Sequence, residues 1–342
     1  MKFHIHRLGC PKNDVDADIW YTRLLAQGCI YEHKPDRADL ILVNTCGFID
    51  DAKEESIEAI LTLAELKEDN PALKIVATGC MPVLFGKEML EELPELDGVV
   101  GNRNLLEEID NFMAGLSKEG RGLILSDEYG IYPAAPAQTE IIQSTFPYAN
   151  LKIAEGCQNH CTYCLLPTIR GPLRSIPSKL ILKQASELLA KGHRELILIA
   201  QDTTLYSDGN KNLADLMHEL NALDGDFWIR LMYAHPAHIT EEIIEALALE
   251  KVVPYLDMPI QHISDNILKS MNRHTTEKEI RSLIDRIKTS IPDIALRTTV
   301  MTGFPGETEQ DFEKLLDFVS EGLFTHLGAF AFSPQEDTPA FD

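Results

Sequence analysis

Three cysteines stand close together in the stretch GCQNHCTYC, where Cys157, Cys161 and Cys164 have the spacing C-x3-C-x2-C. Thiolates at this spacing suit a metal centre, and two chemistries compete for it. A structural zinc site takes four ligands, usually as two pairs, and the pair Cys161 and Cys164 has no second pair here. A 4Fe–4S cluster with one open iron needs only three cysteines, and ferredoxin-type runs use a different spacing. The pattern favours an iron–sulfur cluster, with zinc as the alternative.

Three further cysteines share one local context. Cys10, Cys46 and Cys80 each end a short apolar run, and a glycine is adjacent to each of them. The runs alternate with amphipathic helical segments over residues 1 to 115, which predicts a parallel α/β sheet. Because parallel sheets place ligands beyond the carboxyl ends of their strands, we expect these three thiols on one sheet edge, near each other or a common ligand.

A second, longer series of strand and helix units follows a break in the pattern. The stretch PAAPAQT (Pro133–Thr139) has neither period and contains proline, which predicts a linker. Strands are then expected at residues 151–156, 195–201, 227–233, 252–260, 295–303 and 326–332. Six units are too few for a closed eight-unit barrel. We therefore expect an α/β protein with an N-terminal parallel-sheet domain (1–120), a linker (121–147) and an open, partial (β/α)6 barrel (148–342).

Composition restricts the class of protein. The 342 residues carry a net charge of −23, which argues against general nucleic-acid binding and favours a basic protein partner or a small substrate. No apolar run is long enough to span a membrane, and MKFHIHRLGC lacks the apolar core of a signal peptide. We expect a cytoplasmic protein whose cysteines stay reduced, so that metal or catalytic roles outrank disulfides.

These features together resemble a known family. A C-x3-C-x2-C loop after the first strand of a partial barrel, with Tyr163 before the third cysteine, resembles the radical S-adenosylmethionine (SAM) enzymes. The stretch YANLKIAEGCQNHCTYCLLPTIRGPLRS is similar to their methylthiotransferase branch. GCPKNDVDAD (Gly9–Asp18) and VNTCGFIDDAKEESI (Val43–Ile57) resemble its RimO-type subfamily in particular. LDMPIQHISDNILKSMNR and MTGFPGETEQDF agree, so the resemblance runs over nearly the whole chain.

The resemblance implies an enzyme with two 4Fe–4S clusters. One would be bound by Cys157, Cys161 and Cys164, and the other by Cys10, Cys46 and Cys80. The first would cleave SAM reductively, and the resulting radical would take hydrogen from a carbon too weakly acidic for a general base. The second would carry the sulfur, and a second SAM the methyl group. The product would be a methylthio group on the β-carbon of an aspartate in small-subunit ribosomal protein S12, with an electron-donor protein as a further partner.

Other positions are weaker candidates. The residues expected to contact SAM are Tyr163, Gln201, Asp202, Arg230 and Gln261. Each has an alternative role in packing or in satisfying polar groups at the barrel mouth. Arg170 and Arg174 are candidates to pair with a carboxylate of the cofactor or the target, or to form a solvated basic turn. Cys29, His235 and His262 are read as structural residues.

Three alternatives stay open. The sister tRNA-modifying enzymes, of the MiaB type, share both clusters. A non-catalytic two-cluster iron–sulfur protein and a structural zinc module are the others. Family members usually continue past FSPQEDTPA into a small β-barrel, the TRAM domain, which we expect to be absent because this sequence stops at Asp342.

Overall fold

The computed structural model describes residues 1–115, 121–130 and 147–341. The chain divides into two compact units, each described here by itself. The N-terminal unit comprises Met1–Thr145 together with Thr168–Gly171, and the barrel unit comprises Phe146–Pro167 together with Pro172–Asp342.

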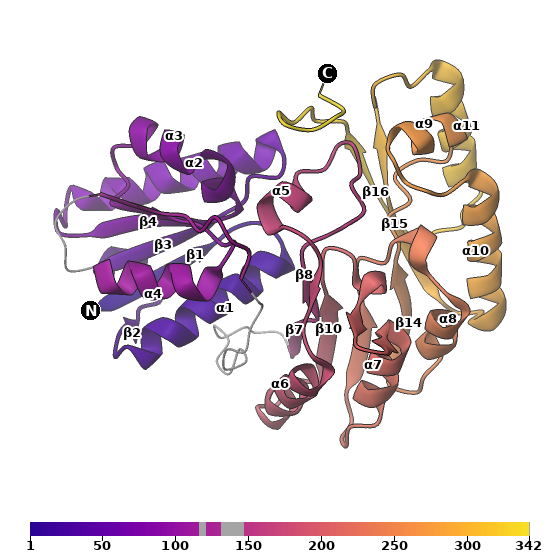
Figure 1. Ribbon diagram of the computed structural model, residues 1–342, viewed down its shortest axis with the longest axis horizontal. Helices are drawn as coiled ribbons and strands as arrows, with labels where there is room; N and C mark the ends of the chain where they lie inside the picture. The colour runs from indigo at the N-terminus through magenta and orange to yellow at the C-terminus, as the bar shows by residue number, and fades with distance from the viewer. Residues whose placement is uncertain (116–120, 131–146, 342) are drawn as a thin grey trace. The chain divides into compact units, whose positions relative to one another are not determined.

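The N-terminal unit is built on a parallel six-stranded sheet (Figure 1). Its strands are β1 (Lys2–Arg7), β2 (Ile30–Tyr31), β3 (Leu40–Thr45), β4 (Lys74–Gly79), β5 (Gly98–Val100) and β6 (Gly122–Ile124). They lie in the order β2-β1-β3-β4-β5-β6, and every pair is parallel. The α/β class predicted from the alternating pattern is therefore confirmed. The chain turns outward in opposite directions from β1 and β3, and such a switch point is where open α/β sheets bind ligands.

Helices cover both faces of this sheet (Figure 1). The helices are α1 (Pro11–Ala26), α2 (Asp50–Ala64), α3 (Cys80–Glu92) and α4 (Leu105–Gly115). Strand β3 is buried along its whole length, since it is covered on both sides. Trp20 of α1 is the largest fully buried side chain; it packs edge-on against Phe112 of α4 and donates a hydrogen bond to Thr78 Oγ1 at 3.2 Å. This bond links α1 to the end of β4, directly before Cys80.

Two local expectations need correction. The helix expected at residues 86–93 is preceded by a helical turn that begins at Cys80, and the two join at a kink at Phe85. A proline at residue 82 is tolerated in that first turn. Strand β6 lies inside the segment assigned to the linker, and it pairs with β5 through Gly98↔Gly122. Only three residues take part, too few for a recognisable pattern. The proline-containing stretch of the expected linker lies outside the described residues.

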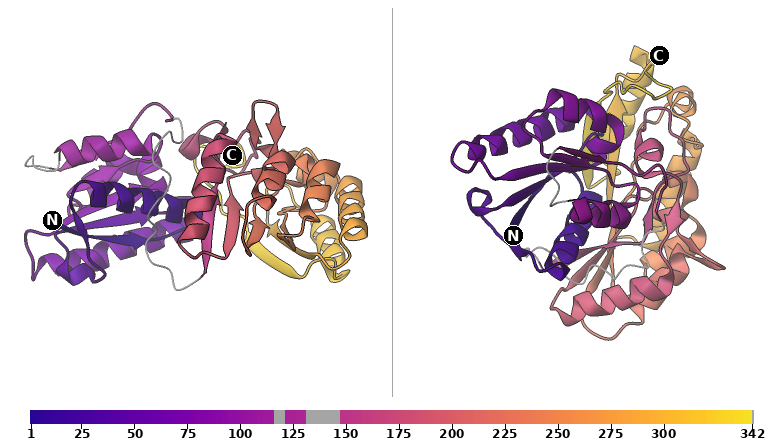
Figure 2. Two further views of the ribbon diagram at one scale, coloured as in Figure 1. Left: turned by 90° about the horizontal axis from the view of Figure 1, so that it is seen from below. Right: turned by 60° about the vertical axis from the view of Figure 1, so that its left-hand side comes forward.

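The barrel unit contains a second parallel sheet of six strands (Figures 1 and 2). Its strands are β7 (Tyr148–Lys152), β10 (Glu195–Ile199), β13 (Trp228–Leu231), β14 (Val252–Asp257), β15 (Ala295–Thr302) and β16 (His326–Ala331). They follow one another in sequence order from β7 to β16, so the expected partial barrel of six units is confirmed. Two short antiparallel pairs stand apart from it: β8 (Ala154–Glu155) with β9 (Arg174–Ser175), and β11 (Ser207–Asp208) with β12 (Lys211–Asn212).

The helices of the barrel unit connect successive strands. They are α6 (Ser178–Ala190), α7 (Leu213–Asn221), α8 (Glu241–Leu247), α9 (Asp265–Ser270), α10 (Glu277–Ser290) and α11 (Glu309–Ser320). Helix α5 (Leu166–Arg170) begins in this unit, but its residues from Thr168 onward belong to the N-terminal unit. Helices α6, α7, α8 and α10 contact one another in that order, which places them side by side along the outside of the sheet (Figure 2). The expected capping box of Thr308 and Asp311 begins α11 and is confirmed. None of the helices in the described parts of the chain is long and apolar enough to cross a membrane.

Gly79 is the backbone element that turns β4 into α3. Its φ of 101° and ψ of −148° belong to a region that is essentially restricted to glycine, and a Cβ there would lie 2.4 Å from the Thr45 carbonyl oxygen. We expect Gly79→Ala to lower the free energy of unfolding by roughly 2–5 kcal/mol. Gly28→Ala is the matched control: its φ is also positive, at 79°, but nothing lies within 4 Å, so it should cost roughly 1–2 kcal/mol.

Urea denaturation followed by Trp20 fluorescence measures this difference. The second of the chain's two tryptophans, Trp228, is 58% exposed, so a Trp228→Phe background leaves a reporter in the N-terminal unit alone. Equal losses for the two glycine variants would contradict the assigned role of Gly79.

Candidate functional site

The cysteines of the N-terminal unit meet at the carboxyl edge of its sheet. Cys10 immediately precedes α1, Cys46 immediately follows β3, and Cys80 is the first residue of α3. A Cβ at Gly9 would lie 3.1 Å from Cys46 Cβ, so the loops after β1 and β3 touch. The thiols of Cys10 and Cys80 are near enough to Cys46 to raise its pKa. The structure brings these three residues together at the switch point; we call this group the N-terminal cysteine site.

Burial dominates the electrostatics of this site. Desolvation, with the nearby Cys80 and Cys10 thiols, raises the pKa of Cys46 to about 11. Burial also raises the pKa of Cys80, while the Arg170 guanidinium opposes that rise. The first turns of α1 and α3 add the positive ends of two helix dipoles. Cys46 and Cys80 are therefore protonated without a cation, and a bound metal centre would displace their protons.

A hydrogen-bond network holds the loops of this site in place. The Asn13 amide nitrogen donates to the Thr45 carbonyl at 3.0 Å and to the Leu8 carbonyl at 3.3 Å, and the Asn44 amide donates to the Asn13 carbonyl at 2.6 Å. Asn102 donates toward Cys80 Sγ at 3.9 Å, whereas its own Oδ1 is buried and has no partner among the described residues. Three thiols in a rigid, partly unsatisfied frame fit a metal cluster.

Arg170 also belongs to the N-terminal unit. The partner expected for this arginine is a carboxylate of the cofactor or the target, but the carboxylate observed beside it is that of Asp16, whose Oδ2 accepts a bond from Nη1 at 2.5 Å. The pair is buried, so Arg170 is not part of a solvated basic turn. Its Nη2 donates to Asn13 Oδ1 at 2.6 Å and to Cys80 Sγ at 3.1 Å. Arg174 lies in the barrel unit, where its Nη1 donates to the Pro172 carbonyl.

The barrel unit carries its cysteines in one loop after β8. Cys157, Cys161 and Cys164 lie within it, and His160 adopts a positive φ of 48°. A neighbouring segment holds the loop: the Thr162 N–H donates to the Met271 carbonyl, and Asn272 donates to the His160 carbonyl at 2.9 Å. The loop geometry therefore depends on contacts about 110 residues away in the sequence.

Burial raises the pKa of two of these three thiols. It raises the pKa of Cys164 to about 12, with Cys161 and Cys157 contributing, and it raises the pKa of Cys157. Arg273 is buried, and its Nη1 lies 3.6 Å from Cys161 Sγ while its Nη2 donates to the Pro259 carbonyl. Three adjacent thiols with one guanidinium beside them form a donor set that fits an iron–sulfur cluster.

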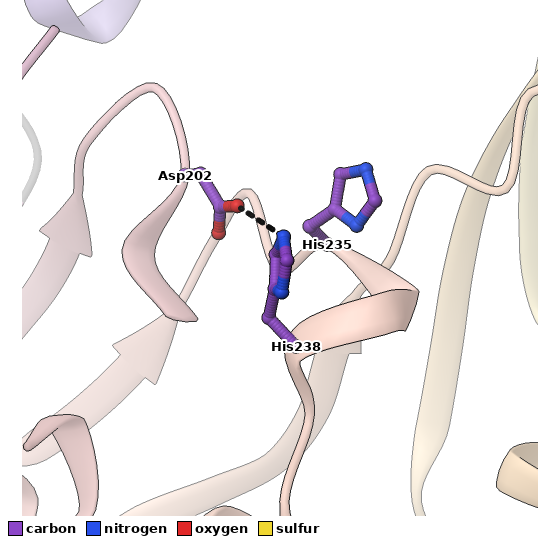
Figure 3. A group of neighbouring side chains, drawn as sticks. All are labelled: Asp202, His235 and His238. Atoms are coloured by element: carbon purple, nitrogen blue, oxygen red, sulfur yellow. Dashed lines mark ion pairs between the residues drawn. The ribbon is translucent and has the colours of Figure 1, made fainter. Parts of the chain in front are cut away.

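Asn159, inside the cysteine loop, connects it to a polar group at the strand ends. Figure 3 shows the members of that group, Asp202, His235 and His238. Asn159 Nδ2 donates to Asp202 Oδ2 at 2.7 Å and lies 3.5 Å from Cys157 Sγ, and its Oδ1 is 2.8 Å from His238 Nε2. Asp202, His235 and His238 offer ligand atoms within 4.8 Å of one another. Because Asn159 already bonds two of them, we read the group as an anchor for the loop.

His235, one member of this group, has a ring N–H without a hydrogen-bond partner among the described residues. Burial, and then the nearby Arg273 charge, lowers its pKa to about 2, so its ring is neutral. Its Nδ1 accepts the Ala237 N–H at 3.2 Å, which leaves the proton on Nε2. Nε2 is buried and has no hydrogen-bond partner among the described residues. A ligand with an acceptor atom would satisfy it.

The other expected SAM contacts have different surroundings. Tyr163 packs in an apolar cluster and meets Phe304 edge-on at 6.3 Å between ring centroids. Gln201 donates to Glu155 at 2.5 Å, beside the strand ends. Arg230 does not join them, because its guanidinium pairs with Glu195, the first residue of β10, and stacks on Tyr255. Sequence alone does not show the direction of a side chain in the middle of a strand.

Gln261 lies just beyond the end of β14. Its backbone adopts a φ of 71°, and it bridges to β15 through bonds to Thr299 and Met301. His262 bonds Glu307 and the Ser264 N–H, in keeping with its structural interpretation.

Four polar residues of these sites were missed by sequence reasoning: Asn13, Asp16, Asn159 and Arg273. Two carried a signal, because Asn13 follows Cys10 by three residues and Asp16 follows Asn13 by three, a spacing that places Asn13 and Asp16 on one face of a helix. Asn159 lies within the cysteine motif itself. Arg273 is 109 residues beyond Cys164, and no local pattern marks it.

Comparisons with known proteins agree with this architecture. The radical SAM superfamily matches residues 151–319, and the uncharacterized protein family UPF0004 matches residues 2–101. A solved structure of the radical SAM methyltransferase TsrM from Kitasatospora setae has a TM-score of 0.70 at 14% identity, covering 99% of this chain and 76% of that one. The radical SAM enzyme OxsB has a TM-score of 0.63, covering 93% and 51%. The fold and the cysteine loop define a radical SAM enzyme.

Curated relatives identify the family within this class. Ribosomal protein uS12 methylthiotransferase RimO of Clostridioides difficile is 44% identical over 345 residues, covering 99% of this chain and 77% of the relative. The RimO protein of Geobacter sulfurreducens is 46% identical, covering 97% and 75%. The chain belongs to the RimO family.

Asn159 is expected to stabilise a cluster bound in the barrel loop. Removing an outer partner of a metal ligand typically costs 10–100-fold in affinity, so Asn159→Ala should release iron to a chelator roughly 10–100-fold faster. The measurement uses reconstituted protein with Cys10, Cys46 and Cys80 replaced by alanine, so that only the barrel loop can hold iron. Asn221→Ala, which removes a bond to Lys251 elsewhere in the barrel unit, is the control. Equal release rates would show that Asn159 does not support the loop.

Proposed function

We propose that this enzyme attaches a methylthio group to the β-carbon of an aspartate in ribosomal protein uS12. The observation that carries the proposal is the presence of two cysteine triads, each beyond the carboxyl ends of the strands of its own parallel sheet. A single radical SAM cluster needs only the barrel triad. The second triad suits a reaction that inserts sulfur, and the RimO relatives support that assignment.

The residues have separate roles in the proposed reaction. Cys157, Cys161 and Cys164 would hold the cluster that provides the electron for SAM cleavage, and Cys10, Cys46 and Cys80 would hold the cluster that provides the sulfur. Asn159 and Arg273 contact sulfur atoms of the barrel loop and orient it. His235 Nε2 would donate a hydrogen bond to an acceptor atom of SAM. The nearby Asp202 and Gln201 are further candidate contacts of SAM.

The charge of the chain favours a protein substrate over tRNA. A net charge of −23 attracts a basic ribosomal protein and repels a phosphate backbone. A substrate on the ribosome places the reaction in the cytoplasm. The electron donor is a further protein partner of this reaction.

Product analysis tests the proposal directly. Anaerobically reconstituted enzyme, SAM, sulfide and a chemical reductant are incubated either with small ribosomal subunits or with tRNA, both from cells lacking the respective modification. We expect mass spectrometry to find the methylthio group on uS12 and to find no methylthio group on tRNA. A methylthio group on tRNA alone would instead assign the MiaB-type reaction.

Cysteine variants separate the two steps. With Cys10, Cys46 and Cys80 replaced by alanine, the enzyme should still form 5′-deoxyadenosine from SAM but add no methylthio group. Cys29→Ala is the matched control, since Cys29 lies outside both triads, and it should retain both products. Methylthio transfer by the triple variant would exclude a sulfur-supplying role for the N-terminal site.

A further inference from the structure

We propose that Arg170 is a positioning residue for the N-terminal cysteine site, where its guanidinium offsets the negative charge of a cluster bound to Cys80, and that Asp16 limits this offset. The inference rests on the proposed function, because it assumes a cluster at these cysteines. It concerns the ease with which that cluster accepts an electron.

The guanidinium of Arg170 lies between a carboxylate and a thiol. One nitrogen, Nη1, donates to Asp16 Oδ2 at 2.5 Å, and the other, Nη2, donates to Cys80 Sγ at 3.1 Å. Asn13 Oδ1 accepts a second bond from Nη2 at 2.6 Å and itself lies 3.4 Å from Cys80 Sγ. Arg170 is 2% exposed and Asp16 is 1% exposed. Water therefore screens neither charge, and both act on the sulfur at close range.

Stability alone is a poor explanation for this arrangement. Burying an ion pair costs desolvation energy that mutual attraction often fails to exceed, so apolar residues would serve packing as well or better. A donor aimed at a cluster sulfur has a specific effect instead. Hydrogen bonds to the sulfurs and the net charge nearby set the reduction potential of an iron–sulfur cluster. The positive end of the Arg170 and Asp16 pair points at Cys80, so it stabilises the reduced, more negative state.

Arg170 is held in this unit by contacts of its own segment. Thr168–Gly171 follows the cysteine loop of the barrel in sequence but packs as part of the N-terminal unit. The Thr168 carbonyl accepts a bond from the Tyr129 hydroxyl at 2.9 Å. Gly171 has a φ of 75°, and a Cβ there would meet the Tyr129 ring at 2.4 Å. The Tyr129 contacts therefore hold the segment in addition to the ion pair, and they keep the guanidinium beside Cys80.

Two substitutions with opposite charge effects test the inference. Arg170→Gln removes the positive charge while keeping an amide donor, and Asp16→Asn removes the negative charge while keeping an acceptor. Both are made in the full chain with Cys157, Cys161 and Cys164 replaced by alanine, so that only the N-terminal cluster is observed. The readout is its midpoint potential, from a redox titration followed by electron paramagnetic resonance.

We expect Arg170→Gln to reduce the equilibrium constant for cluster reduction roughly tenfold, about 59 mV for one electron, and Asp16→Asn to increase it. The midpoint potential of the double variant should return toward that of the parent. The midpoint potential of Arg170→Lys should lie between those of the parent and Arg170→Gln. Arg23→Gln is the control. It removes a positive charge from α1, the helix that carries Asp16, but Arg23 pairs with Asp110 instead of a residue of the cysteine site. The midpoint potential of Arg23→Gln should match that of the parent.

The possible failures are distinguishable. A parent that binds no iron at the N-terminal cysteines would refute the proposed function itself. Suppose instead that the parent binds its cluster. If Arg170→Gln and Asp16→Asn then shift the midpoint potential in the same direction, or do not shift it, the role of Arg170 is overturned. If Arg170→Gln loses its cluster, Arg170→Lys and Asp16→Asn still give opposite predictions relative to the parent and decide the question.

Discussion

The structure depends on bringing three cysteine thiols together at one sheet edge, where burial and the neighbouring thiols disfavour the ionisation of Cys46 in one unit and of Cys164 in the other. Both units use the carboxyl edge of a parallel sheet for this purpose. At that edge the strands converge, and the chain must turn, so short loops can project side chains toward one point. The raised pKa values of Cys46 and Cys164 show how unfavourable free thiolates would be there. A bound cationic centre removes that cost.

Each triad is accompanied by one buried arginine. Arg170 reaches Cys80 Sγ at 3.1 Å, and Arg273 lies 3.6 Å from Cys161 Sγ. The two residues differ in their partners, because Arg170 is paired with a carboxylate whereas Arg273 donates to a backbone carbonyl. A cluster in the barrel site therefore has a full positive charge beside it, and one in the N-terminal site has a charge that Asp16 partly cancels. A buried arginine thus stands beside a cysteine sulfur at both sites, but its hydrogen-bond partners differ.

The sequence was most informative where chemistry is local. The C-x3-C-x2-C spacing, the cysteines at the ends of apolar runs and the alternation of strands and helices were sufficient for the fold class and for the grouping of candidate ligands. Long-range partners were not accessible. Nothing near Arg170 indicates that it packs with Asp16, and Arg230 could not be placed because a strand pattern does not show which neighbour a side chain reaches. The three-residue strand β6 was missed because hydrophobic period needs a longer run.

The central claim is that each triad holds its own cluster. The most direct test measures iron and acid-labile sulfide per chain after anaerobic reconstitution, for the wild type, the two triple-alanine variants and Cys29→Ala. The account predicts two 4Fe–4S clusters in the wild type and in Cys29→Ala, and about half of that iron and sulfide in each triple variant. Full iron and sulfide in the chain that lacks Cys10, Cys46 and Cys80 would contradict it.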